Sequence, residues 1–231
     1  MTGEPARLLV LGANGPTGRR TVEQALERGH HVNALTRHPE TFPIRHDRLH
    51  VTAGDATDPA VIDAAVANTN AVICTIGAAF TRQPVKVYST SARLLVDAIG
   101  RHEKRRLIVV TSSGLGPPQH SGVIGNFFRV LMRDHVGKTV YDDMAEMESS
   151  VSASDLDWTI VRPPGLTNQP GIGYAVAEDQ IEGGICSRED LAAMLLDQLD
   201  DDRFIRKVAA MTSPGMTASA RYMIWHEMLK R

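Results

Sequence analysis

Cysteine is scarce in this chain of 231 residues, which contains only Cys74 and Cys186. Two cysteines so far apart offer neither the ligand spacing of a zinc site nor the density of a disulfide scaffold, so a reducing compartment is expected. The nine histidines lack supporting Cys, Asp or Glu residues at ligand spacing. We therefore predict no metal site.

Long apolar runs and a strong excess of one charge are also missing. No run approaches the length that spans a bilayer, and the first residues, MTGEPAR, contain no apolar segment of a secretory signal. The formal net charge of −2 disfavours a dedicated nucleic-acid surface, which is usually strongly basic. We expect a cytoplasmic protein, monomeric or homodimeric, without a membrane or nucleic-acid partner.

A glycine-rich turn near the N-terminus is the strongest signal in the sequence. The apolar run Leu8 to Leu11 leads into Gly12, Gly15 and Gly18. A helical segment and a second apolar run follow, at residues 19–28 and 32–35. Strand, glycine-rich turn, helix and strand in this order predict a βαβ unit that binds a dinucleotide, with the pyrophosphate at the helix N-terminus.

The end of this unit indicates which dinucleotide is bound. An NAD site usually carries an acidic residue about 20 residues after the glycines, for the ribose hydroxyls. This chain has Thr36, Arg37 and His38 there and no carboxylate before Glu40. Since an arginine can bind a 2′-phosphate through charge-assisted hydrogen bonds, we predict NADP(H), with Arg37 as the residue that selects it.

Strand and helix patterns alternate along the rest of the chain. This alternation predicts an α/β fold of Rossmann type, doubly wound, with a mainly parallel sheet, helices on both faces and a small C-terminal substrate-side region. Further strands are expected at 49–51, 71–75, 107–110, 157–162, 174–176 and 208–211, and helices from Asp58-Pro59 and at 85–99, 140–152, 187–199 and 217–230. Residues 165–173 are expected to form a loop. We predict a single domain, 1–231, with 163–186 and 213–231 as substrate-side or packing appendages.

Several motifs resemble one superfamily. They are Gly12-Ala13-Asn14-Gly15-Pro16-Thr17-Gly18, Gly54-Asp55, Thr111-Ser112-Ser113, Asp142-Asp143 and the stretch SDLDWTIVRPP from Ser154 to Pro164. With them the chain resembles the atypical short-chain dehydrogenases/reductases, in particular the NAD(P)H-binding group of NmrA-like proteins and biliverdin/flavin reductases.

The resemblance implies a set of cofactor-binding residues. The pyrophosphate would be held by Gly12, Asn14, Gly15, Pro16, Thr17 and Gly18, and the 2′-phosphate by Arg37. Asp55 and Ala56 would lie beside the adenine, while Thr75, Ile76 and Gly77 would flank the ribose and nicotinamide. Ser112 and Ser113 would sit near the nicotinamide, in a pocket closed by Pro163.

The Tyr-x-x-x-Lys pair of ordinary short-chain dehydrogenases is missing. None of the four tyrosines, Tyr88, Tyr141, Tyr174 and Tyr222, has a lysine four residues later. Because that lysine lowers the pKa of the tyrosine for proton exchange, its absence disfavours alcohol dehydrogenation and sugar-nucleotide epimerisation. The flavin/biliverdin reductase-like proteins also lack the pair, so a reductase remains compatible with the sequence.

Ser113 and Tyr141 are the candidate catalytic side chains, for protonating or orienting an acceptor. A purely structural role, at a strand end and a helix start, is the alternative for each. An apolar cluster, Phe127, Phe128 and Met132, fits core packing or stacking on an acceptor. Asp142, Asp143, Glu146 and Glu148 are interpreted as a solvated helix face.

These features give a hypothesis of an NADPH-dependent oxidoreductase. Hydride would pass to a small planar acceptor that is flavin-, quinone- or enone-like. The alternative is a non-catalytic, NADP(H)-sensing regulatory protein of NmrA-like type.

Overall fold

A computed structural model of the protein describes residues 5–81, 83–103, 106–116 and 137–216. Its strands are β1 (Arg7–Leu11), β2 (His31–Thr36), β3 (Leu49–Ala53), β4 (Ala71–Cys74), β5 (Arg106–Val110), β6 (Asp157–Arg162), β7 (Gly165–Thr167), β8 (Ala175–Glu178), β9 (Ile185–Ser187) and β10 (Lys207–Thr212). Its α-helices are α1 (Pro16–Glu27), α2 (Pro59–Ala67), α3 (Val87–Arg101), α5 (Lys138–Ser152) and α6 (Arg188–Asp197). Short 3₁₀ helices, η1 (Pro39–Thr41), η2 (Ser113–Leu115) and η4 (Asp202–Phe204), complete the list.

The main sheet has eight strands in the order β3-β2-β1-β4-β5-β6-β10-β8. All neighbouring strands pair in parallel except β8, which pairs antiparallel with β10. The chain winds outward from β1 in both directions, so the strand order reverses between β1 and β4. The predicted Rossmann-type α/β fold is confirmed.

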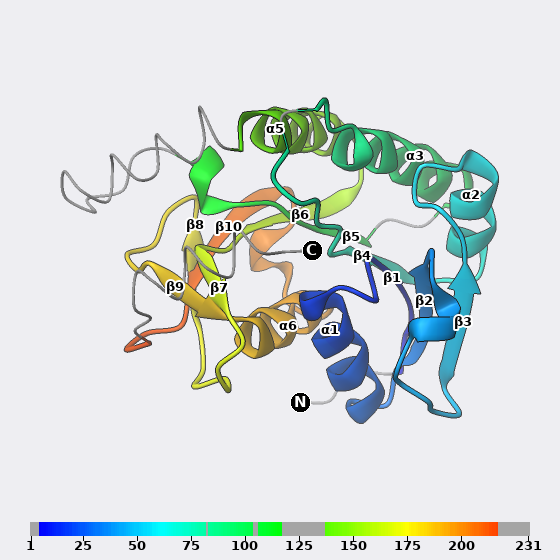
Figure 1. Cartoon of the computed structure of the whole chain (residues 1–231), viewed down its shortest axis with the longest axis horizontal. Helices are drawn as coiled ribbons and strands as arrows, with labels where there is room; N and C mark the ends of the chain where they lie inside the picture. The colour runs from blue at the N-terminus through cyan, green and yellow to red at the C-terminus, as the bar shows by residue number, and fades with distance from the viewer. Residues whose placement is uncertain (1–4, 82, 104–105, 117–136, 217–231) are drawn as a thin grey trace.

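Helices cover both faces of this sheet (Figure 1). Helices α1 and α6 pack on one face, over a core that includes Leu8, Val22 and Leu191. Helices α2, α3 and α5 lie on the other, over a second core that includes Leu9 and Leu95. Successive β1 residues point to opposite faces, and both are buried, which explains the continuous apolar run in the sequence.

Local capping chemistry sets the helix starts. The Asp58 side chain accepts hydrogen bonds from the N–H groups of Ala60 and Val61 and caps α2, as predicted. Ser187 caps α6 in the same way, through the N–H of Glu189. Helix α1 begins at Pro16, earlier than the expected residue 19, because Pro is preorganised for the first helical position.

The expected loop at 165–173 is wrong in its first part. Residues Gly165–Thr167 form β7, which pairs in parallel with β9 in a separate two-stranded sheet. The predicted tail helix at 217–230 and the Phe127, Phe128 and Met132 cluster lie outside the described residues. The division into one domain with two appendages stays a prediction. Within the described part of the chain, no helix is long and apolar enough to cross a membrane.

Candidate functional site: a cavity at the carboxyl edge of the sheet

A cavity of about 1350 Å³ lies along the carboxyl ends of the parallel strands. It runs from the end of β2 and β3, past the turn after β1, to the ends of β4, β5 and β6. Of the residues predicted from the sequence, it is lined by Gly12, Asn14, Gly15, Pro16, Thr17, Arg37, Asp55, Ala56, Thr75, Ile76, Gly77, Ser112, Ser113, Tyr141 and Pro163. In open α/β sheets ligands bind at this edge, at the point where the strand order reverses.

Gly18 is the predicted residue that does not line the cavity, and it has a packing role. A Cβ atom on Gly18 would stand 2.2 Å from the carbonyl oxygen of Gly12. Gly12 itself has a φ of +72°, and a Cβ there would stand 2.8 Å from the backbone of Thr75 and Ile76. The turn therefore requires glycine at both positions so that α1 can start close to β1 and β4.

The start of α1 is open to the cavity. Its N-cap is Gly15, so no side chain caps the first N–H groups of the helix. Uncapped N–H groups and the positive end of the helix dipole form an anion-binding position. This geometry fits the pyrophosphate of a dinucleotide.

The Asn14 side chain fastens the turn to its surroundings. Its Nδ2 donates to Thr41 Oγ1 at 3.0 Å, and its Oδ1 accepts from Arg19 Nε at 3.0 Å and Nη2 at 2.7 Å. These bonds link the glycine-rich turn to the segment after β2. The side chain of Asn14 thus holds the turn in shape, a role that the sequence pattern did not separate from phosphate binding.

Arg37 and Asp55 meet at the β2–β3 end of the cavity. Hydrogen bonds from the Thr57 hydroxyl and backbone N–H lower the pKa of Asp55, and the nearby Arg37 charge lowers it further. The fold therefore brings an ionised carboxylate to the same end of the cavity as Arg37. An arginine there suits a 2′-phosphate, and a carboxylate suits ribose hydroxyls.

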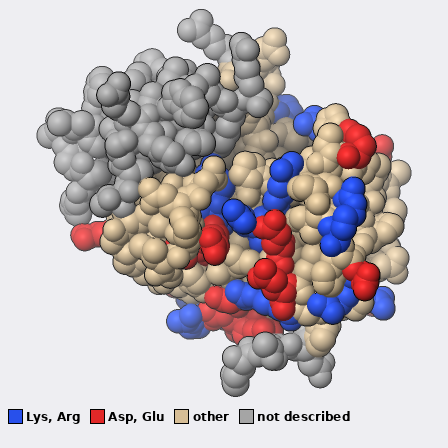
Figure 2. Space-filling view, turned by 60° about the horizontal axis from the view of Figure 1, so that its bottom comes forward, with Lys and Arg blue, Asp and Glu red and all other residues tan. Residues whose placement is uncertain are grey.

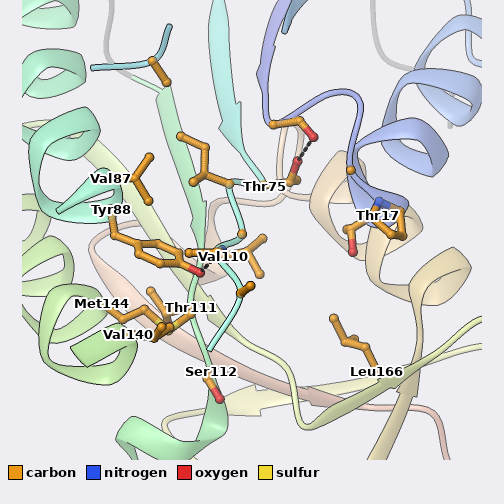
Figure 3. Close-up of a pocket in the computed structure, with 18 of the residues that line it drawn as sticks. Thr17, Thr75, Val87, Tyr88, Val110, Thr111, Ser112, Val140, Met144 and Leu166 are labelled. Carbon is orange, nitrogen blue, oxygen red and sulfur yellow. Dashed lines mark hydrogen bonds between the residues drawn. The ribbon is translucent and has the colours of Figure 1, made fainter. Parts of the chain in front are cut away.

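The segment after β4 forms the middle of the cavity wall. The Thr75 hydroxyl donates to the Leu11 carbonyl at 2.9 Å and so ties the end of β4 to the end of β1. The Tyr88 hydroxyl accepts from the Ala78 N–H at 2.8 Å (Figure 3). Burial raises the pKa of the Cys74 thiol to about 12, so this cysteine is neutral and not a nucleophile.

Ser113 and Tyr141 both adjoin Gly114. The Ser113 N–H donates to the Pro163 carbonyl at 2.9 Å, which joins the ends of β5 and β6. The Tyr141 ring lies against Gly114, where an added Cβ would be 2.7 Å from the ring edge. Tyr141 also stacks on Phe80, with ring centroids 6.3 Å apart and an interplanar angle of 22°. The two catalytic candidates are thus neighbours at one end of the cavity.

Sequence reasoning missed much of the apolar wall. The additional lining residues include Phe80, Val87, Tyr88, Val110, Val140, Met144, Leu166 and Arg188. Figure 3 shows Val87, Val140 and Met144 on the helix side and Leu166 across the cavity. A usable signal existed for half of them, which lie in the first turn of a helix: Val87, Tyr88, Val140 and Arg188.

The interpretation of Asp143 and Glu148 as part of a solvated helix face is wrong. Asp143 is 2% exposed and accepts hydrogen bonds from the N–H groups of Tyr88 and Ser89 at 2.9 and 3.3 Å. It caps α3 from the neighbouring helix α5. Glu148 is 9% exposed and binds Arg162. Both carboxylates face helix or strand partners that are distant in the sequence.

The chain belongs to a family described as NAD(P)H-binding, whose model matches residues 12–202. The predicted NAD(P)H-binding group is confirmed, and NAD(P) is the class of cofactor that this family binds. The matched region contains every predicted site residue, from Gly12 to Pro163.

Among similar proteins, an uncharacterized chloroplastic protein of Arabidopsis thaliana is 29% identical, over 94% of this chain and 80% of its own. An uncharacterized sugar epimerase, YhfK of Bacillus subtilis, is 27% identical over 84% and 88%. The oxidoreductase stcQ of Emericella nidulans is 28% identical over 84% and 77%. The cytoplasmic location remains a prediction.

Two solved structures show the same fold. The short-chain dehydrogenase/reductase of Veillonella parvula in complex with NADP has a TM-score of 0.75 at 23% identity, covering 90% of this chain and 95% of that one. The anaerobilin reductase ChuY of Escherichia coli O157:H7 has a TM-score of 0.69 at 24% identity, covering 92% and 100%. These likenesses show the fold, and the family match shows the NAD(P)H-binding class.

Proposed function

We propose that the protein is an NADPH-dependent oxidoreductase that reduces a small planar acceptor of the flavin, quinone or enone type. The observation that carries this proposal is the continuous cavity from Arg37, past the glycine-rich turn, to Ser113 and Tyr141. Its volume of about 1350 Å³ exceeds the roughly 300–1,000 Å³ of ordinary small-molecule sites. This supports room for a dinucleotide together with a second molecule.

The polar end of the cavity supports NADP(H) in preference to NAD(H). Arg37 provides a fork of donors for a 2′-phosphate, and the uncapped start of α1 provides N–H groups for the pyrophosphate. Asp55 lies close enough to Arg37 for the positive charge of Arg37 to lower the pKa of the Asp55 carboxyl group. We infer that Asp55 contacts the adenosine part of the cofactor. Arg37 offsets the negative charge of Asp55 and binds the 2′-phosphate.

The other end of the cavity supports a planar acceptor. Tyr141 and Phe80 form a stacked aromatic pair, and Val140, Met144 and Leu166 add apolar surface. When bound, NADPH supplies the hydride. The chain itself orients the acceptor on these apolar groups and excludes water. The Ser113 and Tyr141 hydroxyls would orient an acceptor oxygen or nitrogen by hydrogen bonds.

The absence of a Tyr-x-x-x-Lys pair limits the chemistry. Tyr141 is followed four residues later by Ala145, and so lacks the sequence partner that lowers a tyrosine pKa in alcohol dehydrogenases and epimerases. Flavin- and quinone-like acceptors can take their proton from solvent, so they do not need the pair. For this reason we favour reduction over the epimerase activity that the name of the Bacillus subtilis relative suggests.

The surface supports a small molecule rather than a nucleic acid as partner. Basic and acidic side chains are interleaved on the face that Figure 2 shows, without a large basic patch there. Nucleic-acid surfaces are usually strongly basic. A monomer or homodimer acting on a small molecule remains our proposal.

The direct test is the loss of NADPH absorbance when the protein is mixed rapidly with panels of flavins, quinones and enones. We expect turnover with at least one panel, faster with NADPH than with NADH. A Gly18→Ala protein is the matched control, because it should lose the cofactor site and show no turnover. Tight NADPH binding without turnover of any acceptor would contradict the proposal and favour an NADP(H)-sensing regulatory protein. A partner whose affinity changes with the NADPH/NADP⁺ ratio would then support that role.

A further inference from the structure

Tyr88 places a buried hydroxyl group in the middle of the cavity wall. The residue lies in the first turn of α3, is 1% exposed and lines the cavity. Its oxygen accepts the Ala78 N–H at 2.8 Å, and in Figure 3 the ring extends from α3 toward the segment after β4. A phenol hydroxyl both accepts and donates. Among the described residues, none accepts the proton of the Tyr88 hydroxyl.

Strand order indicates which part of a dinucleotide reaches Tyr88. The cavity has Arg37 at the end of β2, the glycine-rich turn after β1, and then the ends of β4 and β5. With the adenosine phosphate at Arg37 and the pyrophosphate at the start of α1, the second sugar must lie over the end of β4. That position is beside Ala78 and Tyr88.

The other hydroxyl group at the end of β4, that of Thr75, is already engaged. The Thr75 proton goes to the Leu11 carbonyl at 2.9 Å, so Thr75 cannot donate to a sugar without breaking that bond. We propose that Tyr88 donates a hydrogen bond to a hydroxyl of the second ribose, the sugar joined to the nicotinamide. This inference rests on the proposed function, since it assumes that a dinucleotide occupies the cavity.

Two contacts hold Tyr88 in place for this role. The backbone N–H of Tyr88 donates to the buried carboxylate of Asp143, and the hydroxyl oxygen is held by Ala78. The backbone of Tyr88 and the hydroxyl end of its side chain are therefore both fixed before a ligand arrives, which lowers the entropic cost of binding.

The pKa of Tyr88 decides between two roles for its hydroxyl group, hydrogen bonding to a ligand and proton transfer. Burial raises the pKa of Tyr88 to about 12, more than the Ala78 hydrogen bond lowers it. An efficient general acid has a pKa near the working pH. Tyr88 therefore stays protonated and serves as a binding group, while Ser113 and Tyr141 remain the candidates for contact with the acceptor.

The test compares two ligands by calorimetry on Tyr88→Phe. NADP⁺ contains the second ribose, whereas 2′-phospho-ADP contains only the adenosine and pyrophosphate half. We expect the Kd of NADP⁺ to rise about tenfold, the effect of one lost hydrogen bond, and that of 2′-phospho-ADP to stay unchanged. Tyr174→Phe is the control, because the Tyr174 hydroxyl binds Asp197 outside the cavity and its loss should change neither Kd.

Other calorimetric results would overturn either the role of Tyr88 or the cofactor assignment. Equal weakening of both ligands would show that Tyr88 acts only by shaping the segment around Ala78, and unchanged binding of both would also overturn the inference. A wild-type protein that binds neither ligand would overturn the cofactor assignment itself. A second measurement needs no variant: the wild-type protein should bind NADP⁺ about tenfold more tightly than analogues in which the nicotinamide-side ribose lacks a hydroxyl. Equal affinity for every such analogue would overturn the inference.

Discussion

The Glu148 carboxylate of α5 holds the Arg162 guanidinium at the end of β6. Arg162 Nε donates to Oε1 at 3.0 Å and Nη2 donates to Oε2 at 2.6 Å. The Thr111 hydroxyl, at the end of β5, donates to the same Oε1 at 2.6 Å. The side chains of Arg162 and Glu148, taken without their backbone atoms, are 15% and 12% exposed, so water screens the pair little. This cluster joins α5 to the two strand ends that carry Ser112 and Pro163 into the cavity.

We expect Glu148→Gln to lower the free energy of unfolding by about 3 kcal/mol, because it leaves the buried Arg162 charge without its counter-charge. Urea unfolding measures this. Asp142→Asn is the matched control on the same helix. Asp142 pairs with Lys138, and both side chains are more than 60% exposed. Its loss should cost less than about 1 kcal/mol. Similar losses for the two variants would contradict a stabilising role for the buried cluster.

Glu148 and Asp143 also show where sequence reasoning failed. The Val140–Ser152 pattern correctly predicted a helix, since its apolar residues recur at helical spacing. The same pattern assigned acidic residues to solvent, because charges are rarely buried without partners. The partners here, Ser89 for Asp143 and Arg162 for Glu148, are 54 and 14 residues away. A single sequence does not reveal such pairs.

The predictable parts of the site were those with a local cause. The glycine-rich turn and the caps at Asp58 and Ser187 depend on neighbours within a few residues, so their patterns were sufficient. Strands β7 and β9 have three residues each and pair across a segment that contains β8, so they leave no usable periodicity. Tyr88 gave no signal either, because its bond to Ala78 depends on how the segment after β4 folds back.

Gly18→Ala should abolish cofactor binding. The added methyl would stand 2.2 Å from the Gly12 carbonyl oxygen, so α1 would have to move away from the turn. Calorimetry with NADP⁺ and a thermal melt check this. Gly100→Ala is the control, since a Cβ there meets no atom within 4 Å. As a helical position it should gain about 0.5–1 kcal/mol of stability and leave the Kd unchanged. A Gly18→Ala protein with wild-type affinity would argue against the turn as the pyrophosphate site.

Arg37→Gln should change the choice between the two dinucleotides. Removing one charge-assisted contact to a phosphate should raise the Kd of NADPH about 10- to 100-fold, with little effect on NADH. Fluorescence titration with both cofactors gives the ratio. Arg20→Gln, which removes an exposed arginine paired with Glu23 on α1, controls for the general loss of positive charge. If both variants weaken NADPH binding equally, Arg37 acts only through the net positive charge that it adds to the protein.

Ser113→Ala and Tyr141→Phe should lower kcat while the Kd of NADPH stays the same. The loss of one hydrogen bond to the acceptor corresponds to about a tenfold effect for each variant. If both hydroxyls contact the same acceptor atom, the double variant should lose less than the product of the two effects. Steady-state kinetics on the best acceptor gives kcat, and fluorescence titration with NADPH gives its Kd. Unchanged kcat in both variants would leave them with the structural roles that the sequence also allowed.

His30 should make stability depend on pH. Its Nδ1 accepts the Ala6 N–H at 3.1 Å, and burial, assisted by the charge of Arg28, lowers its pKa, while Asp200 acts in the opposite direction. The unfolded chain therefore takes up a proton near the ordinary value of about 6.5, at a pH where the folded protein does not. It follows that this contribution to the free energy of unfolding is complete above that pH and is lost as the pH falls from about 7 toward the lower folded-state pKa.

His30→Asn tests this pH dependence, because an amide oxygen can accept the Ala6 N–H without titrating. Urea unfolding between pH 5 and pH 8 should give a shallower slope for the variant than for the wild-type protein. The difference at pH 8, where histidine is neutral in both states, measures the change in packing alone. Only the additional difference in the free energy of unfolding that develops below about pH 7 comes from protonation of His30. Parallel curves over the whole range would mean that the folded protein admits the proton at His30 as readily as the unfolded chain does.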